Sequence, residues 1–178
     1  MRWKMNTSNA GKIQEYSDLF AQQGLELTFT HIDLREIVAD AVTVAAHKAS
    51  HVDEFILIED TSLDIENEDV GINIKWLLIH LDQFLGKRAV WTTYLAYRDK
   101  NKIYMYKGEV KGIIVSPRGD KGFGFDRYFL PDTSKYTLAE DKPDQINARA
   151  HAVKALIKKQ SFAVVEAIHD WQGSWQQE

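Results

Sequence analysis

Two long runs of aromatic and β-branched residues near the middle of the chain constrain its fold more than any other feature. They occupy residues 90–97 and 103–115, and the polar segment Asp-Lys-Asn-Lys at 99–102 joins them. Such runs separated by a short polar turn predict an antiparallel hairpin. Helix-like and strand-like segments alternate before this hairpin. Together these patterns predict an α/β fold with a central mixed sheet flanked by helices.

The segments around the hairpin supply the other predicted elements. Alternating or unbroken apolar patterns predict strands at 2–7, 25–33 and 55–58, and the last is typical of a strand buried on both faces. Apolar residues at helical spacing predict helices at 12–23, 38–49, 73–84, 144–158 and 161–171. Glycines follow the first and third of these helices and act as stop signals.

Composition limits the classes of protein to which this chain can belong. Its 178 residues suit a single domain over 1–178, and 44% hydrophobic and 27% charged residues are ordinary for a globular protein. No apolar run reaches about 18 residues, so no membrane helix is expected. The absence of cysteine rules out disulfides and thiolate metal sites and agrees with a cytoplasmic location. A net charge of −4 argues against a stable complex with nucleic acid.

A glycine-rich turn that begins at Gly119 is the strongest single indication of a ligand site. The sequence Gly-Asp-Lys-Gly-Phe-Gly-Phe-Asp at 119–126 places three glycines around two aromatic residues and an acid. Glycine lets the backbone approach a ligand closely because no Cβ intervenes. Phe123 and Phe125 can stack on a planar group, and Asp126 can accept a hydrogen bond from it. The turn predicts a site for a planar heterocycle, although the same pattern also occurs in plain β-turns.

A second candidate site lies where the first strand meets the first helix. The segment Thr-Ser-Asn-Ala-Gly-Lys at 7–12 places Thr7, Ser8 and Asn9 at the helix N-terminus, where unpaired N–H groups and the helix dipole favour an anion. Lys12 would add positive charge on the same side. The alternative is that Ser8 or Asn9 only caps the helix. The spacing does not match a P-loop.

Carboxylates after the buried strand at 55–58 form the candidate metal site. Glu59 and Asp60 come at the carboxyl end of this strand, at the edge of an α/β sheet where ligands usually bind. Glu36, after the second strand, is the best third acid. Oxygen ligands select a hard ion such as Mg²⁺ or Mn²⁺. The alternative is that Glu59 and Asp60 only cap the following turn.

Two further lysines are candidates for contact with a phosphate chain. Lys75 lies near the predicted start of the third helix, where its charge opposes the helix dipole, and a bound phosphate would relieve that cost. Lys48 lies near the end of the second helix, where any cation is favourable, so its position alone indicates little.

Six segments in this order resemble the inosine triphosphate pyrophosphatase family, whose members hydrolyse deaminated purine nucleoside triphosphates such as ITP, dITP and XTP. The matching segments span most of the chain and are Thr-Ser-Asn-Ala-Gly-Lys at 7–12, Ile-Asp-Leu-Arg-Glu at 32–36, Glu-Asp-Thr-Ser-Leu at 59–63, Ile-Lys-Trp at 74–76, Gly-Asp-Lys-Gly-Phe-Gly-Phe-Asp at 119–126 and Ile-Asn-Ala-Arg at 146–149. The resemblance implies an ITPase-like fold of one or two lobes, with the active-site cleft between the lobes in the second case. It also implies a homodimer.

The resemblance implies a metal-dependent hydrolysis. Mg²⁺, with Mn²⁺ as a substitute, would be held by Glu36, Glu59 and Asp60 and would bridge the triphosphate. Asp60 would act as general base toward the attacking water or else serve only as a ligand. Lys12 and Lys48 would neutralise the phosphate chain during catalysis. The products would be the nucleoside monophosphate and pyrophosphate.

The resemblance also assigns residues to substrate binding. Lys75 would join the other lysines at the phosphates, beside the 7–12 segment. Phe123 and Phe125 would sandwich the base, and Asp126 and Arg149 would contact its edge.

The chain departs from the family pattern in the part that contacts the base. The family has Ser-His-Arg before its last helix, and this chain has Asn147, Ala148 and Arg149. The family lysine just before that motif has no exact match, and Lys142 is the nearest candidate. Two alternatives therefore stay open: the same chemistry on a different nucleotide, or a nucleotide-binding module without turnover. The three retained acids argue against the second.

Overall fold

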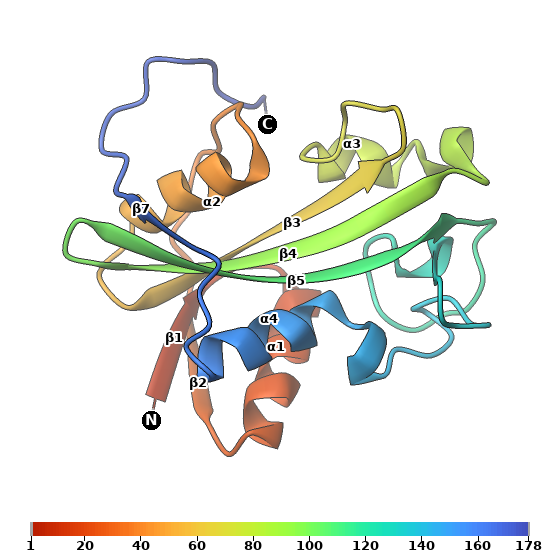
Figure 1. Cartoon of the computed structure of the whole chain (residues 1–178), viewed down its shortest axis with the longest axis horizontal. Coiled ribbons are helices and arrows are strands. Elements are labelled where there is room, and N and C mark those ends of the chain that lie inside the picture. Colours follow the sequence, from red (N-terminus) through yellow and green to blue (C-terminus); the bar gives the residue numbers. More distant parts are fainter. Residues whose placement is uncertain (1, 178) are drawn as a thin grey trace. The chain divides into compact units, whose positions relative to one another are not determined.

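The computed structural model describes residues 2–177 and places seven strands in one mixed sheet flanked by helices, which confirms the predicted fold class (Figure 1). The strand order is β2-β1-β3-β4-β5-β6, and β7 pairs with β5 away from this path. The strands are β1 (Arg2–Asn6), β2 (Glu26–Thr30), β3 (Ile56–Ile65), β4 (Arg88–Asp99), β5 (Lys102–Ile114), β6 (Phe129–Pro131) and β7 (Ala163–Glu166). The helices are α1 (Ala10–Gln22), α2 (Ala41–Ser50), α3 (Ile74–Leu78) and α4 (Ala148–Ile157), with 3-10 turns at Leu81–Phe84, Asp126–Tyr128 and Asp144–Ile146.

Parallel and antiparallel pairings meet in this sheet. Strand β1 is parallel to both β2 and β3, with Met5 opposite Phe29 on one side and Leu57 on the other. Strands β4 and β5 form the predicted hairpin, and a tight turn at residues 100–101 joins them. Strand β5 is antiparallel to β6 and β7. None of the helices in the described part of the chain is long and apolar enough to cross a membrane.

The chain divides into two compact units. The first unit comprises Met1–Asp60, Tyr94–Lys107 and Ala152–Glu178, and the second comprises Thr61–Thr93 and Gly108–His151. Strands β3, β4 and β5 each contribute residues to both units. The expected single domain over 1–178 stays a prediction.

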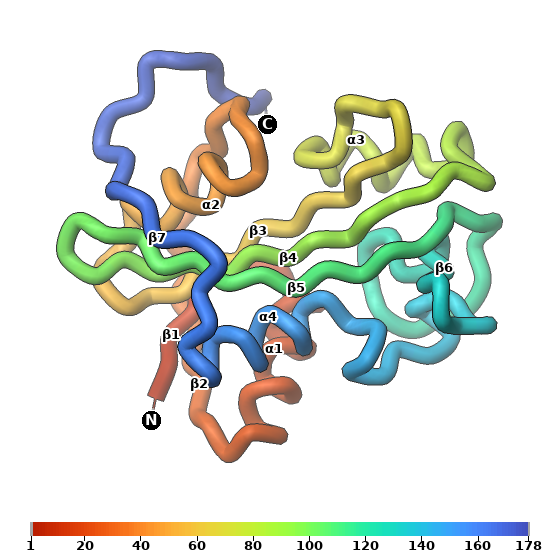
Figure 2. Tube along the Cα trace, in the orientation of Figure 1, coloured from red at the N-terminus to blue at the C-terminus, as the bar shows by residue number. Residues whose placement is uncertain are grey.

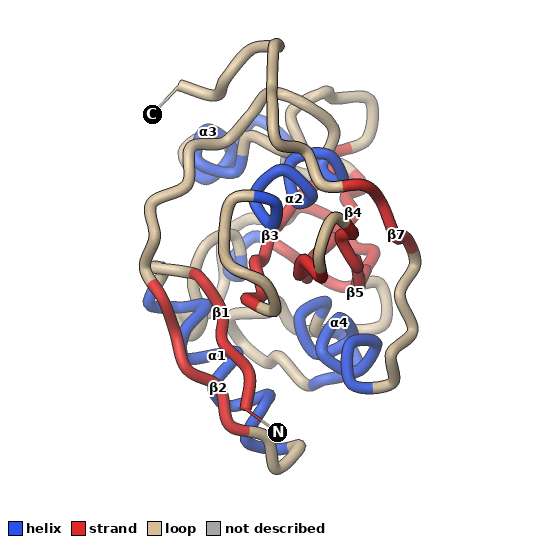
Figure 3. The backbone as a smooth tube through the Cα atoms, turned by 90° about the vertical axis from the view of Figure 1, so that its left-hand side faces the viewer, coloured by secondary structure: helices blue, strands red, loops and turns tan. Residues whose placement is uncertain are grey.

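In the first unit, α1 and α2 lie on opposite sides of β3 (Figures 1 and 3). Helix α1 buries Tyr16 and Phe20, as its apolar spacing predicts. Helix α2 carries small apolar residues at the contact face, and Ala45 and Ala49 pack in one cluster with Ile58 of β3. These short side chains let α2 approach the sheet closely.

An aromatic cluster forms the core of the second unit. Trp91, Phe125 and Phe129 contact one another edge to face, with ring centroids 5.8 to 6.4 Å apart. Aliphatic residues such as Leu63 and Ile114 complete the cluster. The edge-to-face arrangement is the one that aromatic rings favour in packed interiors.

Two predicted helices differ from the structure. The segment 161–171 was expected to be helical and is not: it contains strand β7, in which Val165 pairs with Ile103 of β5, and the residues after it are irregular (Figure 3). Pairing with the edge of β5 outweighs the helical spacing of this segment. The expected helix at 73–84 is divided into α3 and a 3-10 turn at Leu81–Phe84.

Strand β3 is longer than predicted. The apolar run at 55–58 was expected to end before Glu59 and Asp60, but the strand continues to Ile65. All its residues except Asp64 are buried, including Thr61 and Ser62. The two acids therefore lie inside a strand and not in a turn after it, which decides where each side chain points.

We expect the cap of α2 to contribute measurably to stability. Asp40 accepts hydrogen bonds from Thr43 N at 2.9 Å and Thr43 Oγ1 at 2.8 Å. The backbone bond from Thr43 is the main cause that lowers the pKa of Asp40 below its ordinary value of 3.8. Asp40→Ala should lower the free energy of unfolding by about 1 kcal/mol at neutral pH, measured by urea denaturation.

The pH dependence supplies the control for this prediction. Because the pKa of Asp40 is lowered in the folded state, its stabilisation is present above the ordinary pKa and is lost as pH falls through the folded-state pKa. The difference between wild type and Asp40→Ala should therefore shrink in acid. Substitution of the exposed Asp53 should change stability by less than about 0.5 kcal/mol. Equal effects at the two positions would contradict the capping role.

Candidate active site

Lys48 of α2 holds two acidic side chains together in the first unit. Its Nζ lies 3.1 Å from Glu36 Oε1 and 3.5 Å from Asp60 Oδ1, and it donates to the backbone oxygen of Glu59 at 3.1 Å. The side chains of Lys48 and Asp60 are 13% and 12% exposed, whereas that of Glu36 is 37% exposed. One ammonium is thus shared by two carboxylates, and of these three side chains those of Lys48 and Asp60 are mostly shielded from water.

The alternation of β3 sends Glu59 and Asp60 to opposite faces of the sheet, because successive strand residues point in opposite directions. Asp60 points toward Lys48 on α2. The Glu59 side chain is fully buried, its Oε1 lies 3.1 Å from Lys12 Nζ, and its Oε2 accepts a hydrogen bond from Tyr16 OH at 3.2 Å. Both of these partners are on α1.

The expected three-acid cluster is therefore corrected to a pair. Glu36 and Asp60 share Lys48, and Glu59 belongs to a separate group with α1. Among residues 2–177, no set of three His, Cys, Asp or Glu side chains is placed to hold a metal ion. Two carboxylates nevertheless suit Mg²⁺, which usually takes one or two of them together with water and substrate phosphates. Glu36 and Asp60 are the residues that fit such an ion.

Burial tunes the charges in this pair. It raises the pKa of Asp60 to about 6, with the positive charge of Lys48 opposing this rise and the negative charge of Glu36 adding to it. Burial also opposes the charge on Lys48, but the carboxylates of Asp60 and Glu36 outweigh it and raise the Lys48 pKa. Lys48 therefore stays positively charged while Asp60 changes protonation near pH 6.

The segment before α1 forms the helix cap that was left open as an alternative. Asn9 Oδ1 accepts a hydrogen bond from Lys12 N at 3.0 Å, and Thr7 Oγ1 accepts one from Asn9 N at 3.2 Å. Ser8 is exposed beside them. The cap satisfies one N–H group of the helix, and Lys12 directs its ammonium to Glu59.

A second polar group lies in the second unit, around the glycine-rich turn. Asp126 is 2% exposed. Its Oδ2 accepts a hydrogen bond from Phe123 N at 3.0 Å and lies 3.1 Å from Lys142 Nζ. Gly122 has a φ of +74°, and a Cβ there would collide with Asp126 Oδ2. The turn thus needs glycine at this position to bring its backbone against the buried carboxylate.

Two cations lie against the rings of Phe123 and Trp91. The guanidinium of Arg149 is 4.9 Å from the Phe123 centroid and 5.3 Å from that of Trp91. The corresponding distances of Lys142 Nζ are 5.3 and 5.2 Å. Arg149 also donates to Thr61 Oγ1 at 3.1 Å. These contacts place two cations and the buried Trp91 ring beside the partly exposed Phe123.

The comparisons with known proteins agree with this architecture. A family model described as the Ham1 family matches residues 4–159, which is most of the chain. The chain belongs to the Ham1 family. An inosine triphosphate pyrophosphatase of Yarrowia lipolytica is 33% identical to it, over 90% of this chain and 95% of that protein. A dITP/XTP pyrophosphatase of Pyrobaculum aerophilum is 31% identical, over 87% of this chain and 92% of that protein.

One solved structure has a similar fold. It is a nucleoside-triphosphatase / dITP/XTP pyrophosphatase from Mycobacterium abscessus, with a TM-score of 0.58 and 23% identity. The match covers 90% of this chain and 99% of that chain. The likeness supports the fold of this Ham1 chain.

The structure gives the other predicted residues different surroundings. Phe125 is 5% exposed and packs against Trp91 and Phe129, so its ring belongs to the core and is not available to sandwich a base. Lys75 is exposed on α3. Ala148, at the position of the family histidine, is fully buried.

Three residues of these groups were not predicted from the sequence. Tyr16 lies one helical turn after Lys12, so helical spacing placed it on the same face, but its aromatic side chain indicated only a core residue. Trp91 is buried in the core of the second unit and also contacts both cations. Thr61 gave no local signal, because its contact with Arg149 joins residues 88 positions apart.

We expect the Lys142–Asp126 pair to stabilise the glycine-rich turn. Lys142→Met should lower the free energy of unfolding by about 3 kcal/mol, because it leaves the Asp126 carboxylate buried without its counterion. Urea denaturation measures the loss. The exposed Lys121 supplies a matched control, and Lys121→Met should have almost no effect. Adding Asp126→Asn to Lys142→Met should recover part of the loss; an unchanged loss would contradict the pairing.

Proposed function

We propose that this chain hydrolyses the deaminated purine nucleoside triphosphates ITP, dITP and XTP to the monophosphate and pyrophosphate in the presence of Mg²⁺. Membership of the Ham1 family supports the proposal, as do the names of its relatives from Yarrowia lipolytica and Pyrobaculum aerophilum. The observation that carries it is the group formed by Glu36, Lys48 and Asp60. It contains two carboxylates suited to a hard cation, and the pKa of one of them, that of Asp60, is raised to about 6.

Glu36 and Asp60 would hold the Mg²⁺ ion. When bound, the ion would neutralise phosphate oxygens and stabilise the charge that develops on the leaving pyrophosphate. Lys48 would keep the two carboxylates in place before binding and add a positive charge to the phosphate site. Lys12, at the N-terminus of α1, would add another.

Asp60 is the proposed general base. With no metal ion bound, its pKa is raised to about 6, so its carboxylate is ionised at neutral pH and can accept a proton. One of its oxygens would accept the proton of the attacking water. The water oxygen would then bond to the α-phosphorus while the anhydride bond between the α- and β-phosphates breaks. Pyrophosphate would leave, and the monophosphate would remain.

The group around Phe123 is proposed to bind the base. The Phe123 ring would stack on the purine. Lys142 and Arg149 would donate to the carbonyl that hypoxanthine and xanthine carry at C6, where adenine has an amine. A mispaired buried polar edge costs about 1–3 kcal/mol, so one such contact would favour the deaminated base by about 10–100-fold. Asp126 would orient Lys142 through their ion pair.

The assembly and location are proposed from the family resemblance. We propose a cytoplasmic homodimer in which the aromatic face of the hairpin lies at the interface. Tyr97 stacks on Tyr104 and Tyr106 with centroids 5.4 and 6.1 Å apart, and Tyr97 and Tyr104 are partly exposed. An aromatic surface of this kind is typical of protein interfaces.

Pyrophosphate release from ITP, dITP, XTP, ATP, GTP, CTP and UTP, with and without Mg²⁺, tests the proposed substrate. We expect Mg²⁺-dependent release from the first three and at least about 10-fold less from ATP. Release spread over ordinary nucleotides would support the alternative of a changed nucleotide preference, which the buried Ala148 favours because its side chain cannot contact a base. Binding without release from any of them would support a binding module without turnover.

The role of Asp60 predicts a pH-dependent metal affinity. Because the pKa of Asp60 is raised to about 6, the residue carries a proton at pH 5 that a metal ion must displace. Mn²⁺, followed by electron paramagnetic resonance, should therefore bind about 10-fold more weakly at pH 5 than at pH 7.5.

Asp60→Asn should lower kcat by at least about 100-fold while leaving the fold intact. The variant should also remove the pH dependence of Mn²⁺ binding over this range. Asp64→Asn supplies the control, since Asp64 is an exposed aspartate on the same strand. An unchanged kcat in the Asp60 variant would remove Asp60 from the mechanism.

A further inference from the structure

The C-terminal residues lie outside the part of the chain that matches the Ham1 family model, which ends at residue 159. In the first unit they follow a defined path (Figure 2). Strand β7 pairs with β5, and Ile168 N then donates to Ser50 Oγ at the end of α2 at 2.8 Å. The chain continues over α2 to the irregular segment at 31–36, which ends at Glu36.

Backbone and side-chain hydrogen bonds attach this C-terminal segment to residues 36–38. Gln176 N donates to the backbone oxygen of Glu36 at 2.8 Å, and Val38 N donates to the oxygen of Ser174 at 2.9 Å. Gln176 Nε2 adds a bond to Ile37 O at 3.0 Å. Ile37 and Trp175 form an antiparallel bridge between these bonds. Residues 174–176 thus lie antiparallel to residues 36–38 and are hydrogen-bonded to them.

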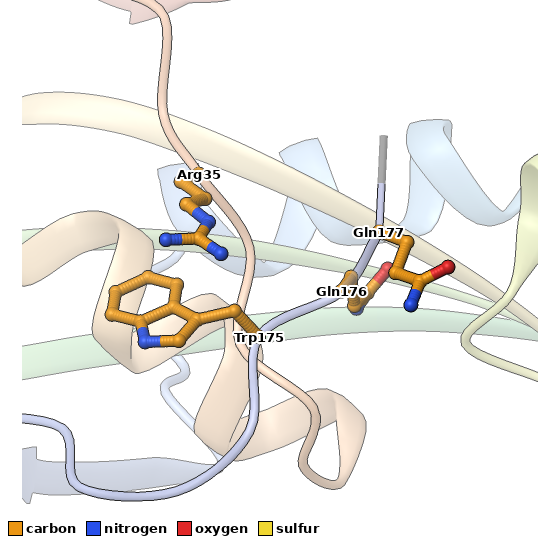
Figure 4. Close-up of a pocket in the computed structure, with 4 residues that line it drawn as sticks. All are labelled: Arg35, Trp175, Gln176 and Gln177. Atoms are coloured by element: carbon orange, nitrogen blue, oxygen red, sulfur yellow. The ribbon is translucent and has the colours of Figure 1, made fainter.

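The Trp175 side chain adds contacts between the C-terminal segment and the residues around Glu36. The Arg35 guanidinium lies 4.8 Å from its ring centroid, on the rim of a surface hollow that Gln176 and Gln177 also line (Figure 4). The ring also meets His47 of α2 edge-on at 5.3 Å. His47 is buried, with 4% of its surface exposed. Trp175 therefore packs against both the Glu36 segment and α2.

The position of Glu36 depends on these contacts because no helix or strand holds it. Its side chain reaches Lys48 from an irregular segment, and its own carbonyl is anchored by Gln176. A metal ligand on an unanchored segment must be ordered when the ion binds, and that ordering weakens binding. Partners that orient metal ligands typically contribute 10–100-fold to metal affinity.

We infer that residues 174–176 position the Glu36 carboxylate for the divalent cation, with Gln176 and Trp175 as positioning residues. This inference rests on the proposed function, since Glu36 is a metal ligand only there. The residues that hold Glu36 in place thereby include a C-terminal segment that lies beyond residue 159, where the match to the family model ends.

Proline substitution of the full-length protein tests this inference. Gln176→Pro removes the N–H group that donates to Glu36 O, and Gln177→Pro places the same residue one position further along as a matched control. We expect Gln176→Pro to weaken Mn²⁺ binding about 10-fold, measured by electron paramagnetic resonance, and to raise the Mg²⁺ concentration for half-maximal activity equally. The kcat at saturating Mg²⁺ should stay close to that of the wild type.

Two further measurements separate positioning from a general loss of stability. Amide hydrogen exchange of the metal-free protein should become faster at Val38 in Gln176→Pro but not in Gln177→Pro. Trp175→Ala should weaken Mn²⁺ binding, and Trp175→Phe should restore most of it because a ring remains to stack against Arg35 and His47.

Wild-type Mn²⁺ affinity in Gln176→Pro, or an equal loss in Gln177→Pro, would overturn the inference and leave the proposed function standing. A wild-type protein that binds Mn²⁺ but releases no pyrophosphate would contradict the proposed function, and the affinities of the two proline variants would still decide the inference. A wild-type protein without Mn²⁺ binding would overturn both.

Discussion

The ammonium group of Lys48 is the charge on which the arrangement of the first unit depends. It meets Glu36 from the segment after β2 and both Asp60 and the Glu59 carbonyl from β3, so one group joins three parts of the chain. Without it, two carboxylates would face each other with little water to screen them. Helix α2 can place this charge only because its alanines approach the sheet closely.

The two polar groups differ in their balance of charge. In the first unit, Lys48 alone lies beside two carboxylates, those of Glu36 and Asp60. In the second unit, Lys142 pairs with the buried carboxylate of Asp126. Two carboxylates around one ammonium would repel a triphosphate, which supports the proposed divalent cation beside Glu36 and Asp60.

The spacing and type of neighbouring residues predicted those elements whose structure depends mainly on nearby residues. The hairpin, helices α1 and α2 and the acids near β3 follow from spacing and residue type, and the structure contains them. The separation of Glu59 from Asp60 was not predictable, because it depends on how far β3 continues through Thr61 and Ser62. The non-helical course of 161–171 was missed for a similar reason: residues 163–166 pair with β5, which is distant in sequence. Pairing between remote segments carries no signal in either segment alone.

The alternation of β3 makes the number of residues in this strand matter as much as their identity. Its side chains repeat every two positions, so one inserted or deleted residue before Glu59 would exchange the faces of Glu59 and Asp60. Each acid would then leave its lysine, and both ion pairs would break although every residue that forms them is still present. A substitution in β3 changes one side chain on one face of the sheet. A change in the length of β3 moves the side chains on both faces at once.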